Sequence, residues 1–146
     1  MVWLIGLSGE RVELLKRRSR VFLGVGRELL ERGVLDLAAF NIQQSCQLRV
    51  KASMLRLLGD FPRIFSVREL LGILAARLDE MGFSGVAMSL RDFARRYRDS
   101  LADIDAIYTM ARYGFFTYTA KDVEEMLRIC GELDRVLEEV ERDVLG

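Results

Sequence analysis

GVLDLAAFNIQQSCQLRVKASMLRLLG, residues 33–59, is the stretch of this chain that decides the fold. A glycine stands at each end and no helix breaker lies between, so we expect one helix from about Leu35 to Leu58. A helix that is apolar on more than one face is usually buried on several sides. This one would therefore be the centre of a helical bundle. Its two apolar faces are Leu35, Ala38, Ile42 and Cys46 on one side, and Leu37, Leu48 and Leu55 on another.

Helix signals continue on both sides of this stretch. Ser8 is placed to cap a preceding helix that ends at Gly33, and Ser66-Val67-Arg68-Glu69 is a capping box for the next one. Within the first helix, Gly24-Val25-Gly26 indicates a close approach between helices rather than a ligand site. The expected segments are helices from Ser8 to about Arg32 and from Ser66 to Met81-Gly82, a loop at Phe83–Val86, a helix at about Ser89–Ala111 with a candidate break near Asp99-Ser100, and an aromatic loop at Tyr113–Tyr118.

The last helix has the clearest periodicity. Thr119 and Asp122 are placed to cap its start, and its apolar residues recur every three and four positions. This spacing is typical of a helix that packs antiparallel to a neighbour in a bundle. The apolar seam is Val123, Met126, Cys130, Leu133, Leu137, Val140 and Val144, and the expected solvent side is Glu124, Glu125, Glu132, Glu138, Glu139 and Glu141.

Composition supports one globular domain over residues 1–146. The 51% of hydrophobic residues and the single proline favour long helices over a β fold, whose many turns require more turn-forming residues such as proline. We therefore expect an all-α, up-and-down antiparallel bundle of about five to six helices. Residues 1–8 form a short apolar arm that is too short for a membrane span or a signal peptide. We expect the arm to pack on the bundle or on a second subunit, and the protein to be cytoplasmic and not bound to a membrane.

The overall charge and the cysteines restrict the functional classes. The 22 basic residues balance the 22 acidic ones, which argues against wholesale coating of nucleic acid. Cys46 and Cys130 have no metal-ligand spacing, so we expect buried thiols in a reducing compartment. Many charges with few amides suggest a heat-adapted source.

The chain contains no histidine, which excludes imidazole as a catalytic base, acid or metal ligand. It also lacks both GxxxxGK[ST] and GxGxxG, the glycine-rich loops that cradle phosphates. We expect no metal site and no cofactor, and no active site is evident from the residues alone.

Three constellations are candidate binding sites. Gln43, Gln47 and Lys51 lie four residues apart, with Gln44 beside them, so they share one helix face that can bind a nucleotide, RNA or a partner. A solvated strip or a polar seam between subunits is the alternative. Arg112-Tyr113, followed by aromatics up to Tyr118, suits phosphate and base contacts, although the same aromatics can simply cover the core. A basic patch is the third candidate, unless its charges are only solvated: Arg95-Arg96-Tyr97-Arg98 with Lys16-Arg17-Arg18 and Arg20.

Residues 33–52 resemble the signature of the HEPN family, the higher eukaryotes and prokaryotes nucleotide-binding domain. That signature has a glycine, a short run, an alanine, an aromatic residue, a glutamine pair, a glutamate and Lys-Ala. The order of later features is also similar, and the resemblance covers roughly residues 10–145. These features are Leu57-Leu58-Gly59, Pro62, Leu70-Leu71, Arg112-Tyr113 and the helix that begins at Thr119.

The resemblance implies an up-and-down bundle, commonly a homodimer, often encoded beside a minimal nucleotidyltransferase in systems of the toxin–antitoxin kind. Many family members are metal-independent ribonucleases that use an arginine and a histidine a few residues later. Here Tyr118 stands where that histidine would follow Arg112, Gln47 replaces the frequent glutamate, and Ser66 replaces a second histidine. Tyrosine is a poor base near neutral pH because its ordinary pKa is about 10. The nuclease activity therefore does not carry over.

The sequence leaves three functional hypotheses. The first is a non-catalytic HEPN-type module that dimerises and binds a nucleotidyltransferase, a nucleotide or RNA through Gln43, Gln44, Gln47, Lys51, Arg112 and Tyr113. The second is a ribonuclease with a degenerate motif, in which Arg112 positions RNA and Tyr118 or Lys51 replaces imidazole. The third is a purely structural assembly protein, joined through its apolar faces and the arm around Trp3.

Overall fold

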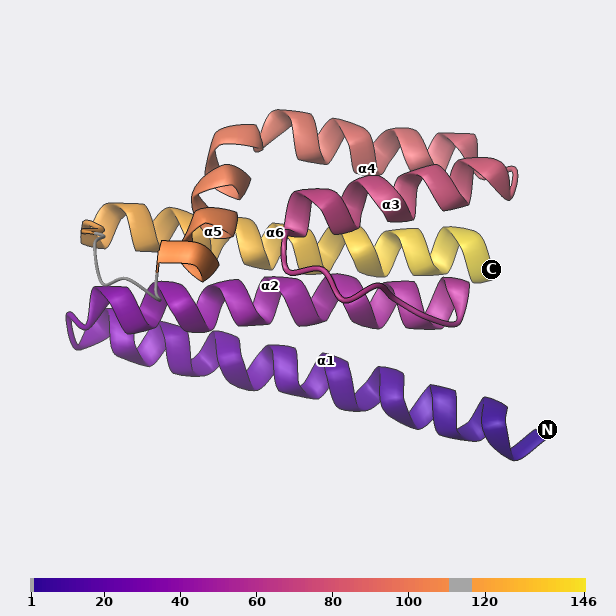
Figure 1. The fold of residues 1–146 in the computed structure, drawn as a ribbon, viewed down its shortest axis with the longest axis horizontal. Helices are drawn as coiled ribbons and strands as arrows, with labels where there is room; N and C mark the ends of the chain where they lie inside the picture. Colours follow the sequence, from indigo (N-terminus) through magenta and orange to yellow (C-terminus); the bar gives the residue numbers. More distant parts are fainter. Residues whose placement is uncertain (1, 111–116) are drawn as a thin grey trace.

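The computed structural model describes the backbone of residues 2–110 and 117–146, and the side chains in these ranges from residue 9 onward. The described residues form six helices and no strand, which confirms the predicted all-α bundle (Figure 1). The helices are α1 (Val2–Glu31), α2 (Leu35–Leu58), α3 (Val67–Glu80), α4 (Ser84–Arg96), α5 (Arg98–Met110) and α6 (Ala120–Leu145).

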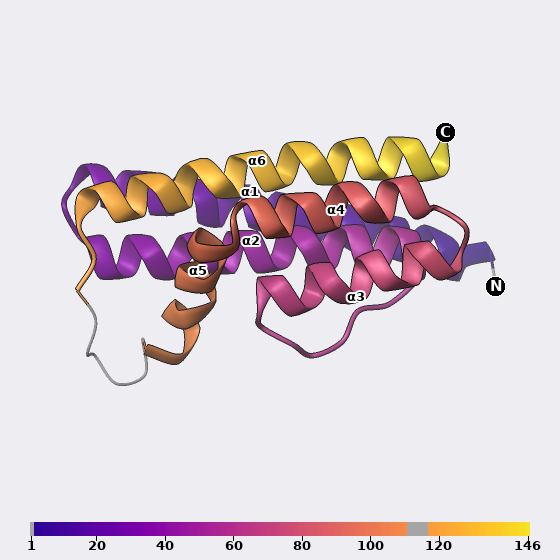
Figure 2. The same cartoon turned by 90° about the horizontal axis from the view of Figure 1, so that it is seen from above.

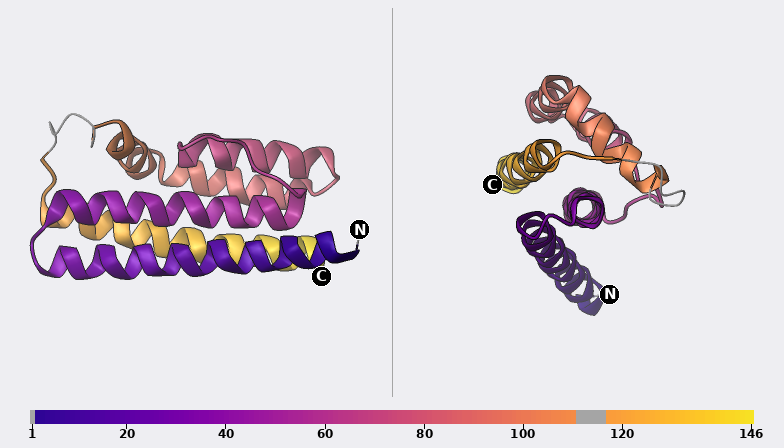
Figure 3. Two further views of the ribbon diagram at one scale, coloured as in Figure 1. Left: turned by 60° about the horizontal axis from the view of Figure 1, so that its bottom comes forward. Right: turned by 90° about the vertical axis from the view of Figure 1, so that its left-hand side faces the viewer.

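Helix α2 is the central element, as predicted. It contacts α1, α3, α5 and α6, and the end-on view in Figure 3 shows it surrounded by them. Its bounds are those expected from the sequence. Gly33 and Gly59 both have a positive φ, 76° and 87°, a conformation that glycine adopts without steric cost. These two residues therefore set the ends of the segment that organises the bundle.

Helix α1 differs from the prediction at its start. It begins at Val2, so Ser8 lies inside the helix and the prediction that Ser8 caps it is wrong. No proline interrupts residues 2–8, so the backbone hydrogen bonding of the helix can continue through them. That the arm of residues 1–8 packs on the bundle or on a second subunit stays a prediction, because its side chains lie outside the described residues.

Gly26 explains how closely α1 and α2 approach. A β-carbon added at Gly26 would lie 2.9 Å from Ile42 Cγ1 and 3.2 Å from the Ala38 carbonyl oxygen. The prediction that the Gly24–Gly26 segment permits close helix packing is therefore confirmed at Gly26. Gly24, in contrast, meets nothing within 4 Å.

The start of α3 is held by α5. Ser66 Oγ accepts the Glu69 amide at 3.2 Å, which confirms the serine half of the predicted box. The glutamate half of the predicted box is wrong, and Asp105 of α5 supplies contacts instead: its carboxylate accepts the Val67 amide at 2.6 Å and the Ser66 hydroxyl at 2.8 Å. A carboxylate at a helix N-terminus also complements the helix dipole.

The loop predicted at Phe83–Val86 is wrong, because α4 begins at Ser84. Gly82 has φ 94°, and the Phe83 amide donates to the Leu78 carbonyl at 2.9 Å, so one tight turn joins α3 to α4. The break in the following segment falls at Tyr97 rather than at Asp99-Ser100. Figure 2 shows the short α5 running at a steep angle to the longer helices.

Helix α6 confirms its prediction in detail. Thr119 and Asp122 form the reciprocal capping box, and all the seam residues are buried except Val144, which is partly exposed. The seam and α2 bury the main core together with α3 and α5. Among the described helices, none combines the length and apolar character that crossing a membrane requires.

Candidate functional site

The polar row on α2 is buried. Gln43, Gln47 and Lys51 are 0%, 4% and 7% exposed, so the alternative of a solvated strip is wrong for these three residues. Gln43 Nε2 donates to the Phe65 carbonyl at 3.1 Å, and Gln44 Nε2 donates to Gln43 Oε1 at 2.9 Å. The row thus holds the segment between α2 and α3 against the bundle, and Gln44 is its most accessible member.

Lys51 lies in an unusual environment for a cation. Its Nζ donates to Gln47 Oε1 at 2.8 Å and lies 5.1 Å and 5.6 Å from the ring centres of Phe65 and Phe61. No carboxylate of the described residues forms an ion pair with it. Burial lowers the pKa of the Lys51 ammonium. A cation stabilised only by an amide and two aromatic rings has unused capacity for an anion.

Gln47, next to Lys51, carries a hydrogen-bond donor that no described residue satisfies. Its Nε2 is buried and has no hydrogen-bond partner among the described residues. Buried polar groups are normally paired, so an orphaned amide next to an uncompensated ammonium marks a candidate site. In the HEPN signature this position carries a glutamate, and a glutamate four residues before a lysine can form an ion pair along the helix. Here that counter-charge is missing.

The covering segment, residues 59–66, presents an aromatic ring to solvent. Phe65 is 43% exposed and stacks on Tyr108 of α5, with ring centres 4.2 Å apart and planes 12° apart. Arg63 of the same segment is exposed. This face therefore combines an aromatic surface, an accessible guanidinium and the buried Lys51 beneath them.

Arg112 and Tyr113, the other predicted binding residues, lie outside the described residues. Tyr118 is described and is partly buried. Burial raises the pKa of the Tyr118 phenol, and the nearby Asp103 and Asp122 carboxylates raise it further. The phenolate is thus even scarcer at neutral pH than in free tyrosine, which weakens Tyr118 as a replacement for imidazole.

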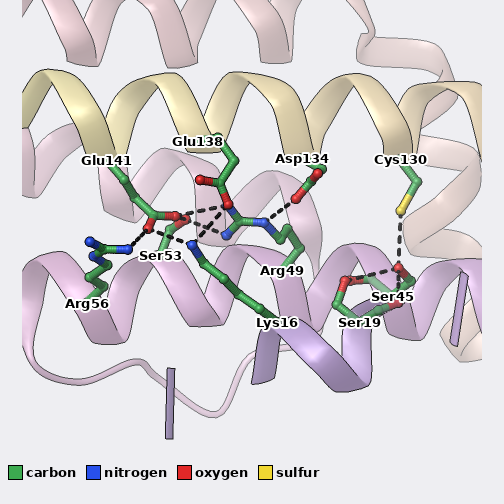
Figure 4. A network of polar contacts seen from close by, with 10 residues as sticks. All are labelled: Lys16, Ser19, Ser45, Arg49, Ser53, Arg56, Cys130, Asp134, Glu138 and Glu141. Atoms are coloured by element: carbon green, nitrogen blue, oxygen red, sulfur yellow. Dashed lines mark hydrogen bonds and ion pairs between the residues drawn. The ribbon is translucent and has the colours of Figure 1, made fainter. Parts of the chain in front are cut away.

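A charged network between α1, α2 and α6 was not predicted (Figure 4). Glu141 is 2% exposed and accepts bonds from Lys16 Nζ at 2.9 Å, Arg49 Nη2 at 2.9 Å and Ser53 Oγ at 2.8 Å. The prediction that Glu141 lies on the solvent side of α6 is therefore wrong. Asp134 and Glu138 complete the network from α6, and Arg56 from α2.

A sequence signal for this network did exist. Arg49, Ser53 and Arg56 follow one another at four and three residues on α2, and Asp134, Glu138 and Glu141 do so on α6. Two such stripes of opposite charge can face each other across a helix pair. The buried network fixes the three long helices relative to one another, so we assign it to stability.

The predicted basic patch is not formed as one surface. Lys16 is buried in the network, and in the described part of the chain α1 does not contact α4, which carries Arg95 and Arg96. Figure 1 shows α1 and α4 on opposite sides of the bundle. Arg95–Arg98 instead line a separate hollow of about 640 Å³ around Tyr97.

Both cysteines are buried, as predicted, and Cys130 Sγ lies 3.6 Å from Ser45 Oγ. Burial and the neighbouring Cys130 raise the pKa of the Cys46 thiol, so Cys46 does not have the features of a reactive thiolate. No group of acidic or cysteine side chains among the described residues is arranged to hold a metal ion.

The fold and the buried row define a helical-bundle domain whose distinctive chemistry lies in one face of its central helix. The model of the HEPN domain matches residues 12–141, nearly the whole chain, and the protein belongs to the HEPN domain family. A comparison with curated protein sequences gives no match.

Proposed function

We propose that this chain is a non-catalytic HEPN module that acts as a homodimer by binding a minimal nucleotidyltransferase, a nucleotide or RNA, in a two-component system of the toxin–antitoxin kind. The observation that carries this proposal is a HEPN chain without any histidine. Imidazole is the group that takes part in proton transfer in the ribonucleases of this family. A module without it retains the bundle and the polar row but not that chemistry.

The face above Lys51 supports an anionic ligand for this module. Phe65 presents an exposed aromatic edge beside its stack with Tyr108, Arg63 offers a guanidinium to a phosphate, and Lys51 lacks a carboxylate among the described residues. A phosphate or an acidic side chain that arrives at residues 59–66 would supply the missing counter-charge. Gln43 then acts by holding this segment in place through the Phe65 carbonyl, and Gln47 by holding Lys51 Nζ.

Ligand-dependent melting tests the nucleotide and RNA forms of the proposal. Bound ligand stabilises the folded state by RT ln(1 + [L]/Kd), so a nucleotide or a short RNA at about 100 times its Kd raises the free energy of unfolding by about 2.7 kcal/mol. We expect this shift in the wild type and its loss in Phe65→Ala. Met88→Ala, which removes an exposed side chain on α4, is the control and keeps the shift.

Co-purification tests the protein partner. A tagged chain expressed together with the product of an adjacent nucleotidyltransferase gene should elute with it in one peak. Absence of binding to a nucleotide, to RNA and to the nucleotidyltransferase would refute the proposed function.

A further inference from the structure

Helix α1 has a second regular stripe that the single chain does not use. Among the described elements α1 contacts only α2 and α6, and Figure 3 shows it at the edge of the bundle. Residues on its solvent side nevertheless recur every four and three positions, the spacing of a two-helix seam. Val21 in this stripe is 60% exposed and Val25 is 38% exposed. We call this set the outer stripe: Glu10, Leu14, Arg17, Val21, Val25, Glu28 and Arg32.

The outer stripe is complementary to itself when it runs antiparallel. Glu10 and Arg32 lie equally far from Val21 on its two sides. A second α1 centred on Val21 in the opposite direction therefore places Glu10 opposite Arg32 of the second copy, and Val21 opposite Val21. The same pairing brings Arg17 within one turn of Glu28 of the second copy. A parallel pairing in register would instead place each charged residue opposite the same residue of the second copy, so that like charges would repel.

Gly24 gives an independent reason for a close neighbour. It is exposed in the middle of α1, and a β-carbon there would meet nothing within 4 Å. Glycine destabilises an exposed helix by about 1 kcal/mol relative to alanine, so its presence is unexplained in the single chain. In the antiparallel pairing Gly24 lies beside Arg17 of the second copy and leaves room for that side chain to extend toward Glu28.

The charge of the outer stripe favours a second copy over a foreign partner. It holds two acidic and two basic residues, so it does not favour an acidic or a basic surface. The adjacent groove, about 540 Å³ and lined by Arg18, Phe22, Gln44 and Leu48 among others, offers apolar surface beside the stripe. The apolar centre is small, and we expect a dimer with a Kd on the order of micromolar.

We propose that two copies of this chain associate through antiparallel α1 helices, with the twofold axis at Val21. This interface rests on the proposed homodimer and assigns it to the outer stripe. It leaves the face above Lys51, which lies on the other side of α2, free for the ligand.

Disulfide trapping tests the position of the axis. The native cysteines are buried, so Val21→Cys introduces the one readily accessible thiol among the described side chains. We expect mild oxidation to link two Val21→Cys chains rapidly, because the axis places the two sulfurs together. Met88→Cys, at a position 63% exposed on α4, is the control for random collisions and should link slowly. Equal rates for the two variants would overturn the proposal.

Charge exchange tests the direction of the helices. Glu10→Arg and Arg32→Glu should each weaken the dimer roughly tenfold in sedimentation equilibrium, and the double exchange should restore it. Arg27→Glu makes the same kind of change away from the outer stripe and should leave the dimer unchanged. Failure of the double exchange to restore association contradicts the antiparallel register.

The outcomes separate this interface from the proposed function. A wild type that sediments as a dimer while Val21→Cys links no faster than Met88→Cys keeps the homodimer and rejects the outer stripe. A wild type that stays monomeric rejects both the homodimer and this interface, and the binding experiments still decide whether the module takes a ligand.

Discussion

Glu141 is the residue at which three helices meet through polar contacts. Replacing it with alanine would leave the Lys16 ammonium and the Arg49 guanidinium buried without their shared carboxylate oxygens. Breaking a buried ion pair from one side costs about 3–5 kcal/mol, so we expect Glu141→Ala to lower the free energy of unfolding by about that amount. Urea denaturation measures the difference. Glu139→Ala, at a neighbouring exposed position, should stay within about 0.5 kcal/mol of the wild type.

The same carboxylate predicts a pH dependence. Burial raises the pKa of Glu141, but hydrogen bonds from Lys16, Ser53 and Arg49 outweigh it, and the folded-state pKa lies below the ordinary 4.5. Its contribution to stability is therefore complete above about 4.5 and is lost as the pH falls through the lowered folded-state value. Glu141→Gln should show a shallower fall of stability in this acid window. An unchanged slope in urea titrations at several pH values would contradict the assignment.

Gln47 offers the reverse experiment, in which a missing charge is supplied. Gln47→Glu places a carboxylate at the atom that Lys51 Nζ already contacts at 2.8 Å. An ion pair with a partly desolvated lysine should stabilise the fold by about 1 kcal/mol and raise the pKa of Lys51. Thermal unfolding measures the gain, with Met88→Glu, which adds a carboxylate at an exposed position of α4, as the control. A lower melting temperature for Gln47→Glu would show that Lys51 does not need a counter-charge.

At the scale of elements, the sequence predicted best where a glycine or a polar cap marks an end. Both bounds of α2 and the start of α6 follow from Gly33, Gly59 and the Thr119–Asp122 box. The start of α4 was missed because its cap is Phe83, which has no side chain that can accept the first amides. The second half of the cap on α3 was assigned wrongly to Glu69, because Asp105, which accepts the Val67 amide, lies in another helix.

A substitution at Gly24 should affect both the stability of α1 and the association of two copies. Gly24→Ala should stabilise α1 by about 1 kcal/mol in urea denaturation at low protein concentration, because nothing in the single chain occupies that space. The same β-carbon should weaken the dimer, since it narrows the room for Arg17 of the second copy. Gly131→Ala, at an exposed position of α6 with equally open space, is the matched control. It should give a similar stabilisation without affecting association, and parallel behaviour of the two variants would argue against the interface.

At the scale of the whole molecule, the family and the bundle were predictable, but the burial of the candidate site and its contacts with other helices were not. The row from Gln43 to Lys51 was found from its spacing and its resemblance to the HEPN signature. Spacing within one helix does not reveal that residues 59–66 cover this row, or that Arg49 reaches carboxylates on α6. Such contacts join residues far apart in the chain, and they depend on how the helices pack.

The absence of histidine gives the module as a whole a sharp functional test. We expect the wild type and Arg112→Ala to cleave RNA at equal, negligible rates, because the raised pKa of Tyr118 leaves even less phenolate at neutral pH than free tyrosine has. Tyr118→His supplies an imidazole at the position where the family's ribonucleases carry one. If imidazole is the part that is missing, this variant should gain about a hundredfold or more in cleavage, and adding Arg112→Ala should abolish the gain. Robust cleavage by the wild type that falls in Arg112→Ala would instead establish a ribonuclease and refute a role limited to binding.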